Sequence, residues 1–236
     1  MTTSSAEPKY IVEQPTLFGQ AEPVGFGTPD FYVKLINRDV ANDMVRRNHY
    51  SKTVYAGTSH HFGVFLGGVL LGVLQWGAAM NPASGPSIVP GLELYEWREL
   101  NRMWIDDAAP KNTESRAISY TIKALRRIYP KLKMVQSFAD ERCGGLGVVY
   151  QACSFGFYGE HEAVFWQLNG EWFHNICMTV VGDELKRRKG AQVLQANADK
   201  AVKHSLRQFR YLRFFSKPAE RACKLERQPY PKRVAT

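Results

Sequence analysis

The stretch from Ser137 to Glu160, SFADERCGGLGVVYQACSFGFYGE, constrains the fold of this chain more than any other. Polar and apolar residues alternate up to Asp140, which predicts a strand that ends there. Glycines from Gly144 to Gly147 interrupt the pattern and open a short helix, which Gly156 ends before a second strand. Ligands bind beyond the carboxyl ends of strands in open α/β sheets, so Asp140 is a candidate site residue.

An uncharged run from Phe62 to Met80 is about as long as a membrane span. Gly67-Gly68 divides it into two strand-length runs rich in Val, Leu and Phe, which predicts a tight hairpin. We therefore expect two central strands of a buried sheet and no membrane partner. The N-terminus shows no signal pattern, and the four cysteines show no zinc spacing, so we expect free thiols in a reducing cytoplasm.

The length of 236 residues suits a single folded core, and the two ends of the chain differ from the rest in composition. Residues 1–25 are polar and dotted with proline, which predicts a flexible N-terminal arm. We expect residues 26–182 to form a mixed α/β domain and residues 183–236 to form a basic helical extension. The net charge is +9, and residues 186–236 alone carry +12, which leaves −3 for the rest. This asymmetry indicates nucleic acid or an anionic surface as the partner.

Basic residues recur at intervals of three and four along the expected C-terminal helix, at Lys200, Lys203, Arg207, Arg210 and Arg213. Acidic partners at i+4 are missing, so the pattern predicts a DNA-binding stripe rather than an ordinary solvated helix face. Tyr211, Phe214 and Phe215 could stack on an exposed base.

The loop PKNTESRAIS joins an expected strand, residues 94–105, to an amphipathic helix, residues 114–129. Asn112, Thr113 and Ser115 can cap that helix, and free backbone amides there would bind an anionic donor. A plain capping loop is an equally good interpretation.

Several polar residues are expected near strand or helix ends. His49 and Tyr50 follow an expected helix, while Asp140 and Tyr150 flank the glycine turn. A histidine, a carboxylate and phenols could bind a hard metal such as iron. They could equally form an acid–base network in which Asp140 orients His49 and Tyr150 moves a proton. Either tyrosine could instead fill the core.

Arg102 lies near the end of the expected strand 94–105. A guanidinium there could bind a phosphate or a carbonyl oxygen of a substrate. An internal ion pair with Glu99 or Asp140 is the alternative. We include Arg102 with His49, Asp140 and Tyr150 as the expected catalytic residues.

The order of strand, glycine turn, VYQA helix and strand resembles the last part of the acyltransferase fold of the GNAT superfamily. That resemblance implies a mixed, mostly antiparallel sheet flanked by helices, with Tyr150 near the reacting carbonyl. Longer segments resemble the Mom family of phage DNA-modification proteins: NHYSK (48–52), ELNRMWIDDAAPKNTESRAISYTIK (99–123), SFADERCGGLGVVYQA (137–152) and LRQFRY (206–211). The second resemblance covers about Phe26 to Tyr211.

The resemblance to the Mom family implies an activity and a target. It implies conversion of adenine in double-stranded DNA to N6-carbamoylmethyladenine, which protects phage DNA from restriction in the host cytoplasm. It also implies iron at His49, Tyr50, Asp140 and Tyr150. The alternatives are a non-catalytic DNA-binding protein on the same fold and an N-acetyltransferase.

The donor of the transferred group stays open between acetyl-CoA and glycyl-tRNA. Ordinary GNAT enzymes hold the coenzyme A pyrophosphate with a glycine-rich loop, whereas this chain has no glycine between Asp106 and Ser119. A glycyl group on N6 could rearrange to the carbamoylmethyl group without a redox step, which favours glycyl-tRNA. A tRNA partner and a homodimer both stay open.

Overall fold

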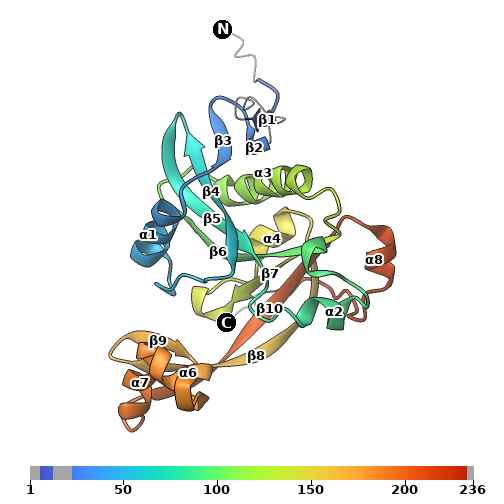
Figure 1. Ribbon diagram of the computed structural model, residues 1–236. Helices are drawn as coiled ribbons and strands as arrows, with labels where there is room; N and C mark the ends of the chain where they lie inside the picture. The colour runs from blue at the N-terminus through green and yellow to red at the C-terminus, as the bar shows by residue number, and fades with distance from the viewer. Residues whose placement is uncertain (1–5, 13–22, 233–236) are drawn as a thin grey trace.

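The computed structural model describes residues 6–12 and 23–232, so most of the expected N-terminal arm lies outside the described residues. Its strands are β1 Lys9–Val12, β2 Pro23–Gly27, β3 Phe31–Leu35, β4 Thr58–Leu66, β5 Val69–Gly77, β6 Trp97–Ile105, β7 Met134–Asp140, β8 Gly156–Leu168, β9 Glu171–His174 and β10 Val202–Phe214. They form one sheet in the order β1-β2-β3-β4-β5-β6-β7-β10-β8-β9 (Figure 1). The described part of the expected arm thus includes a paired strand, β1, because β1 pairs with β2.

Every neighbouring pair of strands is antiparallel except β6 and β7, which are parallel. The helices are α1 Arg38–Asn48, α2 Ser84–Ile88, α3 Thr113–Ile128, α4 Val148–Ala152, α5 Ile176–Thr179, α6 Gly182–Arg187, α7 Lys189–Ala196 and α8 Lys217–Arg221. Single 3-10 turns lie at Leu94–Glu96 and Glu141–Cys143. The expected mixed α/β class, with a mostly antiparallel sheet flanked by helices, is confirmed.

The sheet has a helix on each face (Figure 1). The inner residues of α3 join the main core with Leu74 and Trp76, and the indole of Trp76 donates to Thr121 on α3. On the opposite face Val73 packs against Ala41 and Val45 of α1. This alternation along β5 follows from the two-residue period of a strand, and it explains why β5 is apolar on both faces.

The expected hairpin in the apolar run is confirmed. Its strands are β4 and β5, and Gly67 and Gly68 turn between them with φ of +55° and +81°. These left-handed angles suit glycine, which has no Cβ to clash. In the part of the chain that the structure describes, none of the helices is long and apolar enough to cross a membrane.

The expected C-terminal helix is wrong. Helices α6 and α7 end by Ala196, and β10 then runs for 13 residues between β7 and β8. Pairing on both sides buries Phe209, Tyr211 and Leu212 within the sheet. Residues 183–236 are therefore not a separate helical extension, because β10 completes the central sheet of the domain.

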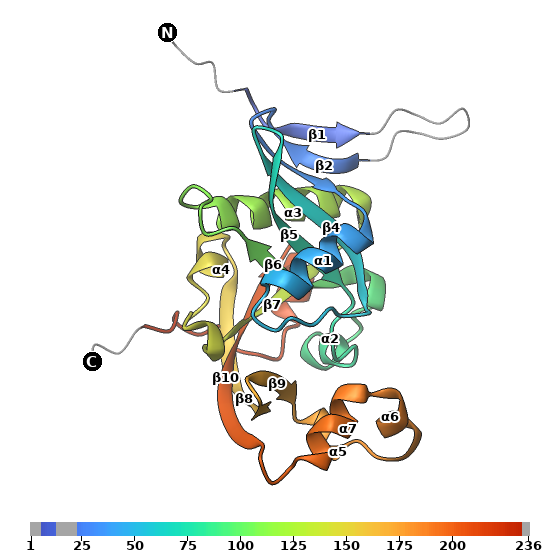
Figure 2. The same ribbon diagram turned by 90° about the vertical axis from the view of Figure 1, so that its left-hand side faces the viewer.

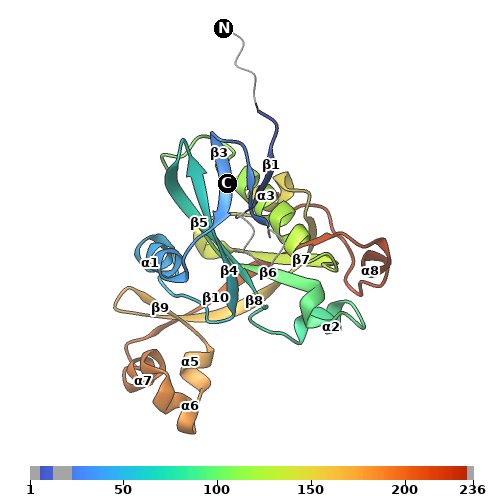
Figure 3. The same cartoon turned by 45° about the horizontal axis from the view of Figure 1, so that its top comes forward.

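A small lobe projects between β8 and β10 (Figures 1 and 2). We call residues 169–201 the lobe; it contains β9, α5, α6 and α7. At the other end of β10, α8 lies beside α2 (Figures 1 and 3), where Ala219 packs with Ile88.

Candidate active site

The site lies where β6 and β7 separate. The two strands pair only from Trp97–Met134 to Glu99–Gln136, although β6 continues to Ile105 and β7 to Asp140. Beyond these pairs each strand carries polar residues, among them Arg102 on β6 and Asp140 on β7. The sequence correctly placed Asp140 at the carboxyl end of its strand.

Asp140 is 5% exposed and binds the side chain of Arg142, two residues further along the chain. The Arg142 backbone N–H and Nε donate to Asp140 Oδ1 at 3.0 and 2.9 Å, and Nη2 donates to Oδ2. Burial alone would raise the pKa of Asp140, but these bonds to Arg142 hold the pKa below its ordinary value. Asp140 is therefore ionised at neutral pH.

Arg142 also connects the strand end to the lobe. Its guanidinium carbon lies 3.8 Å from the ring centre of Phe165 on β8 and 5.6 Å from that of Trp172 on β9. The same carbon lies 5.1 Å from the ring centre of Tyr50. Sequence reasoning missed Arg142; the only signal was its position two residues after Asp140, in a 3-10 turn that Gly144 ends with φ of +63°.

Tyr50 donates its hydroxyl to Asp140 Oδ2 at 3.3 Å. Burial of the hydroxyl, with the Asp140 charge adding to it, raises the Tyr50 pKa well above its ordinary value, so the phenol keeps its proton. The whole residue is nevertheless 46% exposed. Tyr50 therefore faces the site and does not fill the core.

His49 is 5% exposed and is held by Ser51. The Ser51 backbone N–H donates to His49 Nδ1 at 3.1 Å, so Nδ1 is unprotonated and Nε2 carries the proton in the neutral ring. Burial, helped by the charges of Arg102 and Arg142, lowers the His49 pKa to about 3. Within the described residues Asp140 makes no hydrogen bond to His49, so the expected orientation of His49 by Asp140 is wrong.

Arg102 is brought to this region but has no acidic partner. Its Nε donates to the Thr53 carbonyl at 2.7 Å, and its Nη1 donates to the Asn101 carbonyl at 2.6 Å. Among the described residues no carboxylate lies within ion-pair distance, so the alternative of a pair with Glu99 or Asp140 is not observed. Burial lowers the Arg102 pKa, which still leaves an arginine charged at neutral pH.

Tyr150 lies on α4, on the core side of β7. It is 8% exposed, and its hydroxyl lies 3.4 Å from the Phe138 carbonyl. Burial raises its pKa to about 12, so the phenol stays protonated. Nearby on β7, the Ser137 side chain is buried as well.

A second buried network, which sequence reasoning missed, crosses the last pairs of β6 and β7. Gln136 Nε2 donates to Glu99 at 2.7 Å, Asn101 Nδ2 donates to Glu99 at 3.1 Å, and Arg210 donates to Gln136 at 2.8 Å. Burial raises the pKa of Glu99. The sequence marked Glu99, Asn101 and Gln136 only as strand positions, and it placed Arg210 in the expected basic helix.

The residues expected to bind the donor lie at the start of α3. Asn112 precedes the helix with φ of +69° and makes no side-chain cap. Thr113 donates its hydroxyl to the Pro110 carbonyl at 2.6 Å, and Ser115 donates to the Asn112 carbonyl at 3.1 Å. The expected side-chain caps are therefore wrong, because both hydroxyls serve as donors to the preceding loop.

The residues expected to form one DNA-binding stripe have different surroundings. Arg207 pairs with Glu141 at 2.8 Å and with Glu160 at 3.6 Å. Arg213 donates to the Cys153 carbonyl at 2.9 Å, and Arg210 bonds to Gln136 as described above. Lys200 and Lys203 are exposed and have no ion pair among the described residues. A single stripe is not formed, because side chains alternate between the two faces of β10 and Arg210 therefore lies on the face opposite to Arg207 and Arg213.

The residues expected to bind iron, and two of the three expected to stack on a base, are not arranged for it. Tyr211 is fully buried and Phe214 packs on Tyr158, whereas Phe215 is half-buried and lies beneath Arg126. Arg142 occupies both oxygens of Asp140, and both candidate phenols hold their protons. Among the described residues no three His, Cys, Asp or Glu side chains gather as metal ligands. This donor set does not fit iron.

The family comparison decides the relationship. The Mom protein family matches residues 30–232. This chain belongs to the Mom protein family. Methylcarbamoylase Mom of Escherichia phage Mu is 44% identical over 219 residues, which cover 90% of this chain and 88% of that relative. The resemblance that the sequence suggested is thereby confirmed.

Solved structures of acetyltransferases are similar at low identity. A ribosomal-protein-S5-alanine acetyltransferase from Vibrio fischeri is 11% identical, with a TM-score of 0.48 and coverage of 82% of this chain and 98% of that chain. An acetyltransferase of the GNAT family from Streptococcus pneumoniae is 9% identical, with a TM-score of 0.45 and coverage of 79% and 100%. The fold assignment rests on the strand order of this chain and on the succession of β7, α4 and β8.

Proposed function

We propose that this protein is a DNA-modifying transferase that converts adenine in double-stranded DNA to N6-carbamoylmethyladenine. The observation that carries the proposal is the 44% identity to methylcarbamoylase Mom over 90% of the chain. The modification would protect phage DNA from restriction in the host cytoplasm. Because N6 is hydrogen-bonded to the opposite base and adenine is stacked in the duplex, the enzyme has to pull the base from the stack or catch it there.

The polar groups at the divergence of β6 and β7 suit transfer of an acyl group to an amine. Attack of N6 on a carbonyl carbon places negative charge on the carbonyl oxygen. Arg102 is a half-buried cation with no ion pair among the described residues, and it would stabilise that oxygen. Tyr150, with a pKa near 12, keeps a proton that it can give to the leaving group. His49 is neutral and can donate through Nε2.

The donor that we favour is glycyl-tRNA. Attack of N6 on the glycyl ester forms an amide and releases the ribose hydroxyl. The glycyl amine then attacks C6 through a five-membered ring, the bond from C6 to the original N6 breaks, and a proton passes from the amine to that nitrogen. The product is N6-carbamoylmethyladenine, and no oxidant or reductant is needed. The absence of glycine between Asp106 and Ser119 supports this donor over coenzyme A.

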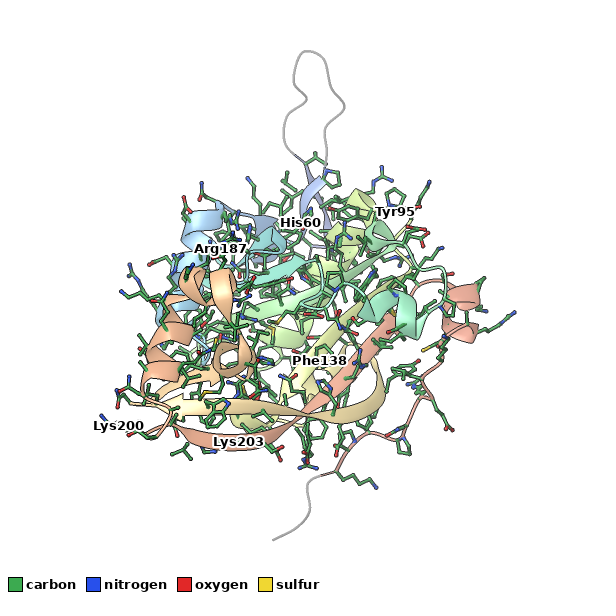
Figure 4. All side chains as sticks on the ribbon, turned by 60° about the horizontal axis from the view of Figure 1, so that its bottom comes forward. His60, Tyr95, Phe138, Arg187, Lys200 and Lys203 are labelled. Atoms are coloured by element: carbon green, nitrogen blue, oxygen red, sulfur yellow. The ribbon has the colours of Figure 1, made fainter. Side chains whose placement is uncertain are left out.

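The surface that we propose for DNA is the basic side of the lobe and the start of β10. Arg187, Lys189, Lys200 and Lys203 are exposed there and have no ion pair among the described residues. Lys200 and Lys203 lie along one rim in Figure 4, with Phe138 of β7 nearer the middle of the view. Arg142 connects this lobe to Asp140, so DNA held by the lobe would lie beside the site.

The DNA surface can be tested with a matched pair of variants. The change K200Q/K203Q removes two unpaired charges. The slope of log K for DNA binding against log salt should then become less steep by about 2. The control K186Q/R188Q removes the same charge, but those side chains already pair with Asp183 and Glu184, so its slope should change less. Equal slopes for the two variants would place the DNA elsewhere.

An isotope experiment tests both the function and the donor. Cells that express the protein receive glycine labelled at both carbons and at nitrogen, and nucleosides from their DNA are analysed by fragmentation mass spectrometry. We expect both carbons and the nitrogen in the modified base, with the labelled nitrogen attached to the ring. Unmodified adenine would refute the function. In a parallel culture that receives labelled acetate instead, acetate carbons with an unlabelled ring-attached nitrogen in the modified base would refute the glycyl route alone.

A further inference from the structure

Helix α3 carries a row of cations that the proposed chemistry does not use. Arg116, Lys123 and Arg127 are spaced by seven and four residues, so they lie on one side of the helix, and Arg126 lies next to Arg127. All four are exposed. No ion pair joins any of them to another residue in ranges 6–12 and 23–232. We call these four residues the α3 stripe.

Aromatic rings hold three of these cations without neutralising them. The Arg116 guanidinium carbon lies 4.2 Å from the ring centre of Phe31, and Lys123 Nζ lies 4.6 Å from that of Phe26. The Arg126 guanidinium carbon lies 4.8 Å from the ring centre of Phe215. A cation over a ring keeps its full charge, so the α3 stripe presents fixed positive charges to a ligand.

A cavity of about 360 Å³ lies at the carboxyl-terminal end of the α3 stripe. Lys123, Arg126 and Arg127 line it together with three aromatic side chains: Tyr10 of β1, Tyr129 at the end of α3, and Phe215, which directly follows β10. Cations beside exposed rings are the combination that binds single-stranded nucleic acid, because the cations contact phosphates and the rings stack on bases. This cavity therefore suits a nucleotide better than an isolated inorganic anion.

The dipole of α3 does not explain the whole row. Arg126 and Arg127 lie in the last turn, where cations are favoured by the negative end of the helix. Arg116 lies in the first turn, where the positive end disfavours a cation, and Lys123 lies between the two ends. A ligand with several negative charges accounts for all four positions.

We propose that the α3 stripe binds the phosphate backbone of a structured RNA that carries the donor group, an inference that rests on the proposed function. Eleven residues separate Arg116 from Arg127, which is about 16 Å along the helix. That length exceeds one pyrophosphate and matches several successive phosphates of a nucleic acid strand. Coenzyme A would engage only part of it.

The position of α3 explains how an RNA and a DNA could serve one site. Helix α3 follows the diverging end of β6, and Cys153, which directly follows α4, donates to the Ser115 carbonyl at 3.1 Å. The α3 stripe thus leads toward Tyr150. Helix α1, which ends just before His49, covers the opposite face of the sheet (Figure 1). Two large substrates can meet at the divergence of β6 and β7 if the RNA approaches along α3 and the DNA approaches along the lobe.

The test measures binding of deacylated tRNA and of a short DNA duplex to the full chain as a function of salt. In R116Q/K123Q/R127Q the slope of log K against log salt for tRNA should fall by about 2, while the slope for DNA stays as in the wild type. K217Q/R221Q/K224Q removes the same charge from exposed positions around α8 and should leave both slopes unchanged. Arg116 packs on Phe31, so its replacement also changes packing; K123Q/R127Q, which keeps Arg116, is measured for that reason. R116K/R127K keeps both charges and should bind tRNA like the wild type.

Three results would overturn the inference. They are wild-type protein that does not bind tRNA, an unchanged tRNA slope in both Gln variants, and an equal fall of the tRNA and DNA slopes. Competition with coenzyme A distinguishes the donor source: displacement of tRNA at stoichiometric coenzyme A would also overturn it. Nucleoside analysis of DNA from cells with wild-type protein reports on the proposed function separately, so the two can fail independently.

Discussion

The pair of Asp140 and Arg142 should be the most sensitive element of the site to substitution. In the folded protein the Asp140 side chain is 4% exposed and that of Arg142 is 12% exposed, so water screens the pair little. Arg142→Met keeps most of the packing against Phe165 but leaves a buried carboxylate without its cation. Breaking one side of a buried pair costs about 3–5 kcal/mol, and we expect about 3 because Tyr50 and Gln208 still donate to Asp140.

A double-mutant cycle separates the charge pair from packing. Asp140→Asn removes the charge, so Arg142→Met should cost about 2 kcal/mol less in the Asp140→Asn background than in the wild type. Both single variants should lose DNA modification, since Asp140 holds Tyr50 at the site. Urea unfolding at neutral pH measures the free energies, and retention of the wild-type circular dichroism spectrum checks the fold.

The cost of Arg142→Met should depend on pH. In the wild type the Asp140 pKa is depressed, so its contribution to stability is present above the unfolded pKa of about 3.9 and is lost as pH falls through the folded pKa. In Arg142→Met the guanidinium is gone, and burial, the largest influence on Asp140, outweighs the remaining hydrogen bonds and raises the Asp140 pKa above 3.9. Acid then protonates the carboxyl and removes the cost of the buried charge. The difference in the free energy of unfolding between wild type and Arg142→Met should therefore narrow by about 1.4 kcal/mol per pH unit as the pH falls from the variant's Asp140 pKa to about 3.9. A gap that is constant from pH 7 to pH 4 would refute the buried pair.

Three further outcomes follow from the geometry. Gly147→Ala should destabilise the fold by about 3 kcal/mol, because φ is +73° and a Cβ would lie 2.3 Å from the Tyr211 ring. Gly144→Ala should cost only about 1–2 kcal/mol, because φ is +63° but the space around it is open. Equal Tm shifts for the two variants would contradict this. EDTA or an iron chelator should leave modification in vitro unchanged, because Arg142 occupies Asp140, and rescue of a chelated sample by iron would contradict it. His49→Gln should leave the shape of the pH–rate profile unchanged between about pH 5 and 8, since a pKa near 3 keeps His49 neutral there, and loss of an ionisation near pH 6.5 would contradict that.

The sequence correctly predicted elements whose signals are local. Gly67-Gly68 set the hairpin of β4 and β5, and a 3.6-residue apolar period set α3. The glycines after Asp140 ended β7 and opened α4, which put Tyr150 beside that strand. Each of these signals lies within about 20 residues, so no distant contact was needed to interpret it.

The prediction for residues 202–214 failed because the deciding contacts are distant in sequence. The basic residues recur at helical intervals, but β10 pairs with β7, about 70 residues away, and with β8. Burial between two strands outweighs a local helical pattern.

The site could be predicted as a set of residues but not as a set of partners. Asp140, Tyr50 and Arg102 do lie around the diverging ends of β6 and β7, as strand ends and loops suggested. Arg142 and the network of Glu99, Gln136 and Arg210 depend on side-chain contacts across strands, which spacing alone does not contain.

The charges of the site residues affect both steps of the glycyl route, the transfer of the glycyl group and its rearrangement. Asp140 is neutralised by Arg142, His49 is neutral and both phenols hold their protons. Among these site residues Arg102 is therefore the cation that has no ion pair with a described residue. This cation stabilises the oxyanion of the transfer step. It also lowers the pKa of a glycyl amine held nearby, because like charges disfavour the protonated form. Attack on C6 requires that amine to be unprotonated. Arg102→Met should therefore slow transfer, and it should also shift the rearrangement to higher pH, so that N6-glycyladenine accumulates at pH 7; a variant that slows transfer without any accumulation of this intermediate would assign Arg102 to the first step alone.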